Sequence, residues 1–227
     1  MEILDSIPGS IEAEHVLRQA HLTDVDDETR RSALALVAQA QHLARPKVVY
    51  RVCYVENKAA DSLEIGGIRF TSRVLRANLD AVERVFAYVG TAGTELDQVA
   101  VPGGDMLLGY CLDIIKEMVL RAALTHLREY LSAKYALGRT AQMNPGSLAD
   151  WPIQQQRELF AVFGDVQKLV GVRLTDSFLM IPTKSVSGII FPTEVRFESC
   201  QLCPREICPG RRAPYDVQLA AKYGISP

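Results

Sequence analysis

Residues 171–188 have the sequence GVRLTDSFLMIPTKSVSG, and this stretch does most to decide the fold. Two short apolar runs, 170–174 and 178–180, lead into 185–191, which predicts a β-strand that contains a glycine. Residues 194–198 are a candidate partner for that strand. This part of the chain is therefore expected to contribute to a sheet.

A tight loop precedes this stretch. Residues 143–152 are rich in turn-forming residues, and the tightest part is Asn144-Pro145-Gly146-Ser147. A helix is predicted to start at Pro152 and to continue through Leu159 and Phe163. Asn and Gly suit such a turn for backbone reasons alone, so the loop sequence does not by itself require a ligand.

The longest regular pattern follows Pro102-Gly103-Gly104. Asp105 is a suitable N-cap, and no helix breaker occurs before about Ala136, so a helix of roughly 45 Å is predicted. Glu117 and Arg121 are spaced to pair one turn apart. The apolar side predicts a central core helix and consists of Leu108, Cys111, Leu112, Ile115, Met118, Val119 and Ala122.

Residues 1–46 are predicted to be a mainly helical N-terminal segment. Residues 2–4 could extend, and Ser10 is a candidate cap for a first helix. A second helix is expected after Asp26 and to end before Pro46.

Residues 47–227 are predicted to form one α+β unit. Strands are expected at 48–55, at 68–70 and at 82–89, and a short helix at 213–223. A cysteine-rich tail begins at about residue 198.

Composition limits the class of protein. The chain has 227 residues, is 48% hydrophobic and has a formal net charge of -2, which is ordinary for a globular protein. The near-neutral charge gives no reason to expect nucleic acid or a membrane as a partner. Without a long apolar run or a secretory signal, the chain is expected to be cytoplasmic.

Common cofactor motifs are missing. The sequence has neither a P-loop nor a G-x-G-x-x-G fingerprint, which argues against the usual nucleotide and dinucleotide sites. The four histidines are scattered through predicted helices and are best explained as structural.

Three of the five cysteines, Cys200, Cys203 and Cys208, lie within nine residues of sequence. Their C-x₂-C-x₄-C spacing would let three thiolates bind zinc or an iron–sulfur cluster, with a fourth ligand from elsewhere. Arg205, Arg211 and Arg212 would favour thiolates, so reactive or redox thiols are a second possibility. Plain packing is the third.

The loop, the Leu159-Phe160 pair and 171–188 together resemble the activation domain of vitamin B12-dependent methionine synthase. That family shows a Pro-Gly loop, a Leu-Phe helix, a Gly-Val-x-Leu-Thr-x-Ser stretch, Met-x-Pro and Ser-Val-Ser-Gly before a strand, and the same order occurs here over 143–191. The turn at 91–96 resembles that of short, free-standing members. The fold implied is α+β, with a twisted, mainly antiparallel sheet and flanking helices, one of them long.

The resemblance implies S-adenosylmethionine binding and a role as an accessory or reactivation protein beside a cobalamin-carrying partner. The partner would be a corrinoid protein or the core modules of a methionine synthase, which this chain is too short to contain. A pocket is expected between loop 144–150 and strand 185–191. The residues expected to bind the cofactor are Arg139, Asn144, Pro145, Gly146, Ser147, Ser185, Ser187 and Gly188.

The chain departs from the family pattern at the loop. Ser147 stands where the family has Tyr, and the nearest upstream arginine is Arg139, several residues early. These differences leave two further hypotheses. The chain could be an interaction module for a corrinoid protein that has lost the ligand, or a redox protein whose cysteine cluster delivers electrons to cobalt.

Overall fold

The computed structural model describes residues 1–8, 11–208 and 210–225, and α4 (Met106–Tyr135) is the predicted long helix. Asp105 caps it by accepting hydrogen bonds from the backbone N–H groups of Leu107 and Leu108. Ala136 adopts a left-handed conformation (φ 50°) and ends it. The predicted pair of Glu117 and Arg121 is present, at 2.9 Å.

A seven-stranded sheet forms the body of the molecule, with strand order β4-β3-β2-β5-β9-β6, and every pairing in it is antiparallel. The first strand, β1, pairs with β2 beside β3. The predicted α+β fold with a mainly antiparallel sheet is therefore confirmed. The strands are β1 (Glu2–Leu4), β2 (Lys47–Glu56), β3 (Ser62–Ile65), β4 (Ile68–Thr71), β5 (Arg84–Thr91), β6 (Thr140–Met143) and β9 (Ser185–Pro192).

The partner predicted for strand β9 was wrong. Residues 194–198 form no strand, and β9 pairs instead with β5 and with β6, whose register joins Met143 to Ile189. The four residues of β6 directly precede the loop and carry too weak an alternation to stand out in the sequence. The two short apolar runs supply a separate hairpin, in which β7 (Arg173–Leu174) pairs with β8 (Met180–Ile181).

The two faces of the sheet have different covers, as alternate residues of β5 show. Val85, Ala87 and Val89 pack with residues of α3 (Arg73–Asn78), α5 (Gln156–Ala161) and α6 (Val166–Val170). Phe86 and Tyr88 point the other way and pack with Ala123, Leu127 and Leu131 of α4. The second half of α4 therefore covers this face over β2, β5 and β9.

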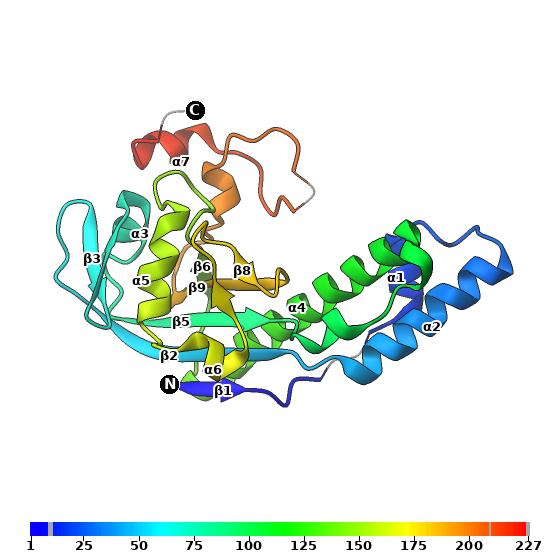
Figure 1. Cartoon of the computed structure of the whole chain (residues 1–227). Coiled ribbons are helices and arrows are strands. Elements are labelled where there is room, and N and C mark those ends of the chain that lie inside the picture. The colour runs from blue at the N-terminus through cyan, green and yellow to red at the C-terminus, as the bar shows by residue number, and fades with distance from the viewer. Residues whose placement is uncertain (9–10, 209, 226–227) are drawn as a thin grey trace.

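The first half of α4 extends beyond the sheet and carries the N-terminal helices (Figure 1). These are α1 (Ala13–Gln19) and α2 (Asp27–Leu43), and both pack on α4 in one apolar cluster. Asp26 caps α2 as expected, whereas Ser10 lies outside the described residues. The predicted boundary near residue 46 stays a prediction.

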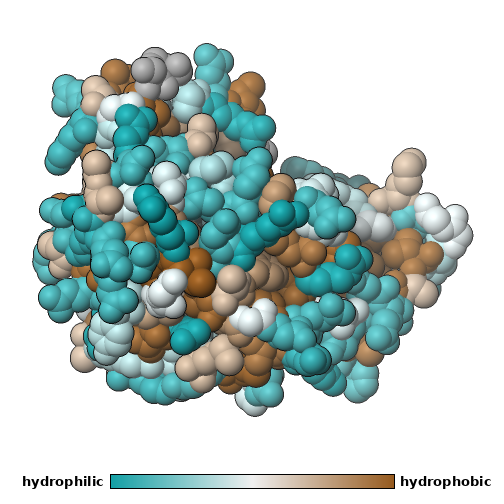
Figure 2. All heavy atoms as spheres, turned by 60° about the vertical axis from the view of Figure 1, so that its left-hand side comes forward, coloured by the Kyte–Doolittle hydropathy of each residue, from teal (hydrophilic) through white to brown (hydrophobic). Residues whose placement is uncertain are grey.

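The remaining elements are short, and several flank the sheet. They are η1 (Glu95–Gln98), η2 (Pro102–Gly104), η3 (Ile153–Gln155), η4 (Ser199–Leu202) and α7 (Val217–Lys222). In the described part of the chain no helix combines the length and apolarity needed to cross a bilayer. Hydrophilic residues cover much of the face in Figure 2, with apolar patches between them.

Candidate functional site

Asn144 lies directly against Gly188, on the face of the sheet that α4 covers. Its Nδ2 donates hydrogen bonds to the Ser187 backbone oxygen at 2.7 Å and to Tyr88 Oη at 2.9 Å. A Cβ on Gly188 would lie 2.3 Å from Asn144 Nδ2, so only glycine leaves room for this contact. The loop and the strand thus meet as predicted, but the Asn144 amide fills the space expected to be a pocket.

The Pro-Gly turn is shaped by packing. Gly146 has a φ of +83°, and a Cβ there would lie 2.6 Å from Ile153 Cδ1. Pro145 is buried, while Ser147 is exposed and donates its N–H to the Asn144 oxygen at 3.1 Å. Glycine at 146 is therefore explained by the backbone and by Ile153, without a ligand.

Arg139 lies at the far end of β6 from this turn. It is exposed, and its Nη1 donates to the Glu194 backbone oxygen at 3.2 Å. The four residues of β6 lie between it and Asn144, which puts their Cα atoms about 16 Å apart. The structure does not bring Arg139 together with the other predicted site residues.

Ser185 and Ser187 point to the opposite side of the sheet from Gly188, because side chains alternate along a strand. Ser185 Oγ donates to the Pro182 oxygen at 2.7 Å and lies 2.9 Å from Thr91 Oγ1. Ser187 Oγ is buried and has no hydrogen-bond partner among the described residues. Neither hydroxyl shares a surface with the Gly188 side of the sheet.

A groove lies where α4, β6 and the C-terminal tail meet. We define the tail as residues 198–208 and 210–216. Two cavities of about 250 and 460 Å³ make up the groove, and both are lined by Arg128, Gln142 and Arg212. The other lining residues are Arg121, Leu124, Thr125, Thr140, Ala141, Ile190, Glu198, Cys200 and Gly210. Edge strand β6 forms its floor.

Charged side chains stand on both walls of the groove. Arg128 of α4 donates from Nη1 to Gln142 Oε1 at 3.1 Å and from Nη2 to Thr125 Oγ1 at 3.3 Å. Arg212 of the tail lies with its Nε 3.1 Å from Glu198 Oε2. The groove is therefore rich in hydrogen-bond donors and carries one carboxylate beside its guanidinium groups.

Hydrogen bonds link the predicted residues to the groove. Gln142 Nε2 lies 3.5 Å from Asn144 Oδ1, and its Oε1 accepts from Arg128. Asn144 in turn is held by Tyr88, whose pKa is raised by burial, so its hydroxyl stays protonated and available for hydrogen bonding. Asn144 and Gly188 thus support the groove from below rather than line it.

A third cavity, of about 420 Å³, follows the same side of α4 toward its N-terminus and shares Arg121 with the groove. Lys184 stands in it, 3.0 Å from Asp113 Oδ2 and 3.6 Å from Glu117 Oε2. Carboxylates therefore dominate one end of this surface and arginines the other.

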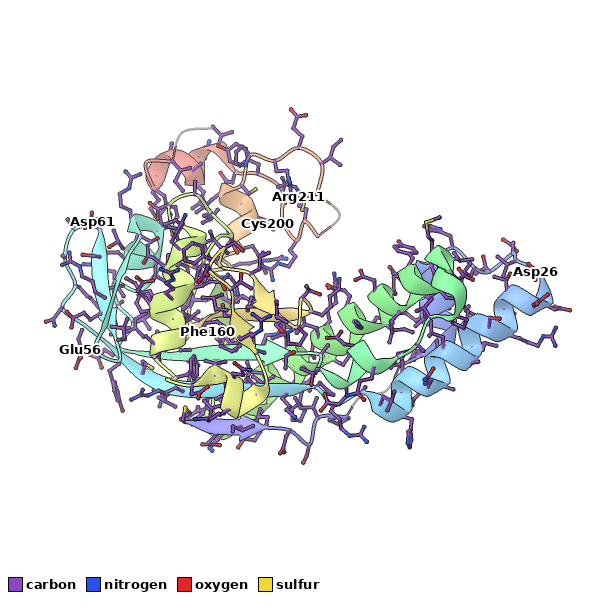
Figure 3. All side chains as sticks on the ribbon, viewed as in Figure 1. Asp26, Glu56, Asp61, Phe160, Cys200 and Arg211 are labelled. Carbon is purple, nitrogen blue, oxygen red and sulfur yellow. The ribbon has the colours of Figure 1, made fainter. Side chains whose placement is uncertain are left out.

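Two of the tail cysteines, Cys200 and Cys203, have different surroundings. Cys200 lines the groove and accepts a hydrogen bond from the Arg212 backbone N–H at 3.5 Å. Partial burial acts to raise the pKa of the Cys200 thiol, but hydrogen bonds from Arg212 and its charge outweigh burial and lower it. Cys203 instead packs on the core, and Figure 3 shows Cys200 beside Arg211 in the tail.

The metal site predicted at the tail cysteines stays a prediction. Over residues 1–8, 11–208 and 210–225, no group of three His, Cys, Asp or Glu side chains could hold a metal ion. The two other thiols, Cys53 and Cys111, are buried in different core clusters. Cys200, Cys203 and Cys208 therefore do not form a preassembled set of metal ligands in the described part of the chain.

Sequence reasoning missed most of the groove. Arg128 is seven residues after Arg121, so both project from one side of a helix, and this spacing was the available signal. Gln142 and Glu198 carried no signal, because only the fold places them opposite α4. Arg212 was predicted to favour a thiolate, and the lowered pKa of Cys200 agrees with this.

Comparisons with known proteins bear on the family. Residues 121–200 match the family model "Vitamin B12 dependent methionine synthase, activation domain". Among solved structures, the fold is similar to the MetH reactivation domain bound to AdoHcy, with a TM-score of 0.56 and 17% identity over 82% of this chain and 68% of that one. No curated protein matches the chain. The resemblance is thereby confirmed: residues 121–200 carry the sequence pattern of the vitamin B12-dependent methionine synthase activation domain, and the chain has the fold of that domain.

Proposed function

We propose that the chain is a reactivation component of a corrinoid-dependent methyltransferase and binds S-adenosylmethionine in the groove. The observation that carries the proposal is the match of residues 121–200 to the activation-domain family, because this segment supplies Arg128, Gln142 and Glu198 to the groove. The similar MetH domain binds AdoHcy, which is S-adenosylmethionine without its methyl group.

The groove has the size and chemistry for such a ligand. Its cavities fall within or near the range of about 300–1,000 Å³ that is usual for small-molecule sites. Guanidinium groups suit the methionyl carboxylate, and Leu124 offers apolar surface to adenine. A sulfonium requires nearby carboxylates, which Glu198 and the cavity with Asp113 provide.

An accessory protein must also expose the reactive group to its partner. The side chains of Arg121 and Arg212 are 70% and 44% exposed, so the groove opens to solvent. When bound, S-adenosylmethionine supplies an activated methyl group, and reduced cobalt on the corrinoid partner is its acceptor. The chain's own residues bind the ligand and orient it toward the opening.

Calorimetric titration with S-adenosylhomocysteine, which is chemically stable, tests the site. Thr125 projects from α4 into the larger cavity, so Thr125→Trp should abolish binding by filling it. Ala133→Trp is the matched control, at an exposed position of α4 outside the groove lining, and should bind normally. Absence of binding to the unmodified chain, or equal affinity in the Thr125→Trp variant, would contradict the proposal.

The partner half of the proposal has its own measurement. A purified cobalamin-carrying module of a methionine synthase is reduced and mixed with S-adenosylmethionine, and methylcobalamin is followed by its absorption spectrum. Adding this chain should accelerate the methylation, and adding the Thr125→Trp variant should not. A rate that is the same with and without the chain would rule out reactivation of that partner.

The second candidate is a non-catalytic interaction module for a corrinoid protein. It is favoured by Arg139, which binds the Glu194 carbonyl at the far end of β6 and leaves the turn without its expected arginine. This candidate predicts tight binding to the cobalamin-carrying module together with no heat of binding for S-adenosylhomocysteine.

A further inference from the structure

The C-terminal tail forms one complete wall of the groove. Glu198 and Arg212 line the smaller cavity, and Cys200, Gly210 and Arg212 line the larger one. The opposite wall belongs to α4 and the floor to β6. Both cavities therefore depend on the tail being in place.

Two consecutive arginines in the tail have different tasks. Arg211 turns inward, and its guanidinium donates to the backbone oxygens of Cys200 and Ala213, each at 3.2 Å, and to Cys203 at 3.3 Å. Arg212 turns outward to the groove, where its Nε lies 3.1 Å from Glu198 Oε2. Its guanidinium also acts on the Cys200 thiol, whose pKa it lowers. Arg211 therefore shapes the tail, and Arg212 is available to a ligand.

Arg128 presents a second guanidinium from the opposite wall. It lines both cavities together with Arg212, and the bonds to Gln142 and Thr125 fix its position. Glu198 is the one carboxylate among the residues that line these two cavities. Two cations and one anion around a shared space suit a zwitterion, since a carboxylate can bind both guanidiniums and an ammonium can bind Glu198.

We propose that Arg212 and Arg128 together bind the α-carboxylate of an amino-acid-bearing ligand and that Glu198 receives its ammonium group. The tail is then part of the ligand site, although it lies largely outside the segment that matches the family. This inference rests on the proposed function, because the ligand in question is the amino-acid end of an S-adenosyl compound. A free phosphate or sulfate shares the anionic chemistry and serves as the competing explanation.

The assignment of Arg212 to the α-carboxylate is tested by removing the amino-acid end from the ligand and the guanidinium from the protein, separately and together. S-adenosylhomocysteine carries the amino-acid end, and 5′-methylthioadenosine lacks it. Arg212→Ala should weaken the binding of S-adenosylhomocysteine by on the order of 10-fold or more, which is the usual loss for a charged hydrogen bond. The same substitution should change the affinity for 5′-methylthioadenosine by less than about 2-fold. Arg205→Ala removes a tail charge outside the groove and should leave both affinities unchanged.

The outcomes separate this inference from the proposed function. The assignment of Arg212 to the α-carboxylate is wrong, while the proposed function stands, in either of two cases where S-adenosylhomocysteine binds the unmodified chain. In the first, Arg212→Ala lowers the affinity for S-adenosylhomocysteine and for 5′-methylthioadenosine equally; in the second, it lowers neither. If the unmodified chain binds phosphate but not S-adenosylhomocysteine, both are wrong. Thermal unfolding of each variant is the control for correct folding. Arg212→Lys should recover part of the affinity for S-adenosylhomocysteine, because it retains the charge.

Discussion

Gly188→Ala is the substitution for which the structure makes its sharpest prediction. The new Cβ would lie 2.3 Å from Asn144 Nδ2, 2.8 Å from the Met143 oxygen and 2.9 Å from Tyr88 Oη. Met143 belongs to the paired strand β6 and cannot move freely, so Asn144 must leave. Its hydrogen bonds to Tyr88 and to the Ser187 oxygen would then be lost.

The expected loss of stability follows from three contributions. Overpacking in a well-packed region costs about 1–3 kcal/mol. The two lost hydrogen bonds cost about 1 kcal/mol each, because the Tyr88 hydroxyl is fully buried. Alanine restricts the unfolded chain and returns about 0.5–1 kcal/mol. The free energy of unfolding should therefore fall by about 2–4 kcal/mol, which a domain of ordinary stability survives.

Urea denaturation measures this change through the midpoint at constant m-value. Gly109→Ala is the matched control, because a Cβ there meets nothing within 4 Å and lies in helix α4. It should raise the free energy of unfolding by up to about 1 kcal/mol. The reasoning fails if Gly188→Ala lies within about 0.5 kcal/mol of the unmodified protein, or if adding Asn144→Ala gives a strictly additive loss.

Four further results are expected. Asp150→Ala should lower the free energy of unfolding by about 1–3 kcal/mol in urea denaturation, because this carboxylate accepts hydrogen bonds from the start of α3, whereas exposed Asp176→Ala should change little. The rate of Cys200 alkylation, measured by mass spectrometry, should reach half its maximum at a lower pH in the unmodified chain than in the Arg212→Ala variant. The reason is that Arg212 lowers the pKa of this thiol more than burial raises it. Elemental analysis tests the metal hypothesis: zinc and iron should stay well below one equivalent per chain, because the described residues contain no preassembled group of three ligands, and a full equivalent would show that this reasoning is wrong. Arg211→Ala should weaken the binding of S-adenosylhomocysteine in a calorimetric titration, although Arg211 does not line the groove, because Arg211 holds the tail in place. An affinity equal to that of the unmodified chain would contradict this role of Arg211.

The elements that sequence predicted well are those with strong local signals. Helix α4 has a capping Asp105, a long apolar stripe and no breaker, so both of its ends were located. Strands β2 and β5 are rich in β-branched and aromatic residues. Strand β6 was missed because four residues cannot show a convincing alternation, and its pairing with β9 is a long-range choice. Residues 194–198 were wrongly predicted to pair with β9 because nearness in sequence was the only guide to strand pairing, and the true partners of β9 are distant in sequence.

The site was predicted in part for a similar reason. The family pattern led to Asn144 and Gly188, which do meet, because a motif retained in sequence marks where two segments touch. The family pattern did not reveal that the Asn144 side chain fills the space between the loop and the strand, because packing depends on side-chain positions that no local sequence pattern contains. Gln142 and Arg212 became candidates only when the fold placed them on one cavity.

The groove draws its two walls from segments of different kinds. Arg128 and Gln142 lie within the stretch that matches the activation-domain family, and Arg212 lies beyond it, in the tail. In the proposed site, the family segment supplies the floor and one cation, and the tail supplies the second. The arginine that is displaced from the turn to Arg139 then need not be a lost function, because Arg128 and Arg212 place positive charge over the edge of the same strand, β6. Glu198 holds Arg212 at 3.1 Å, and Gln142 and Thr125 hold Arg128, so both guanidiniums are oriented before a carboxylate arrives, as the proposed site requires.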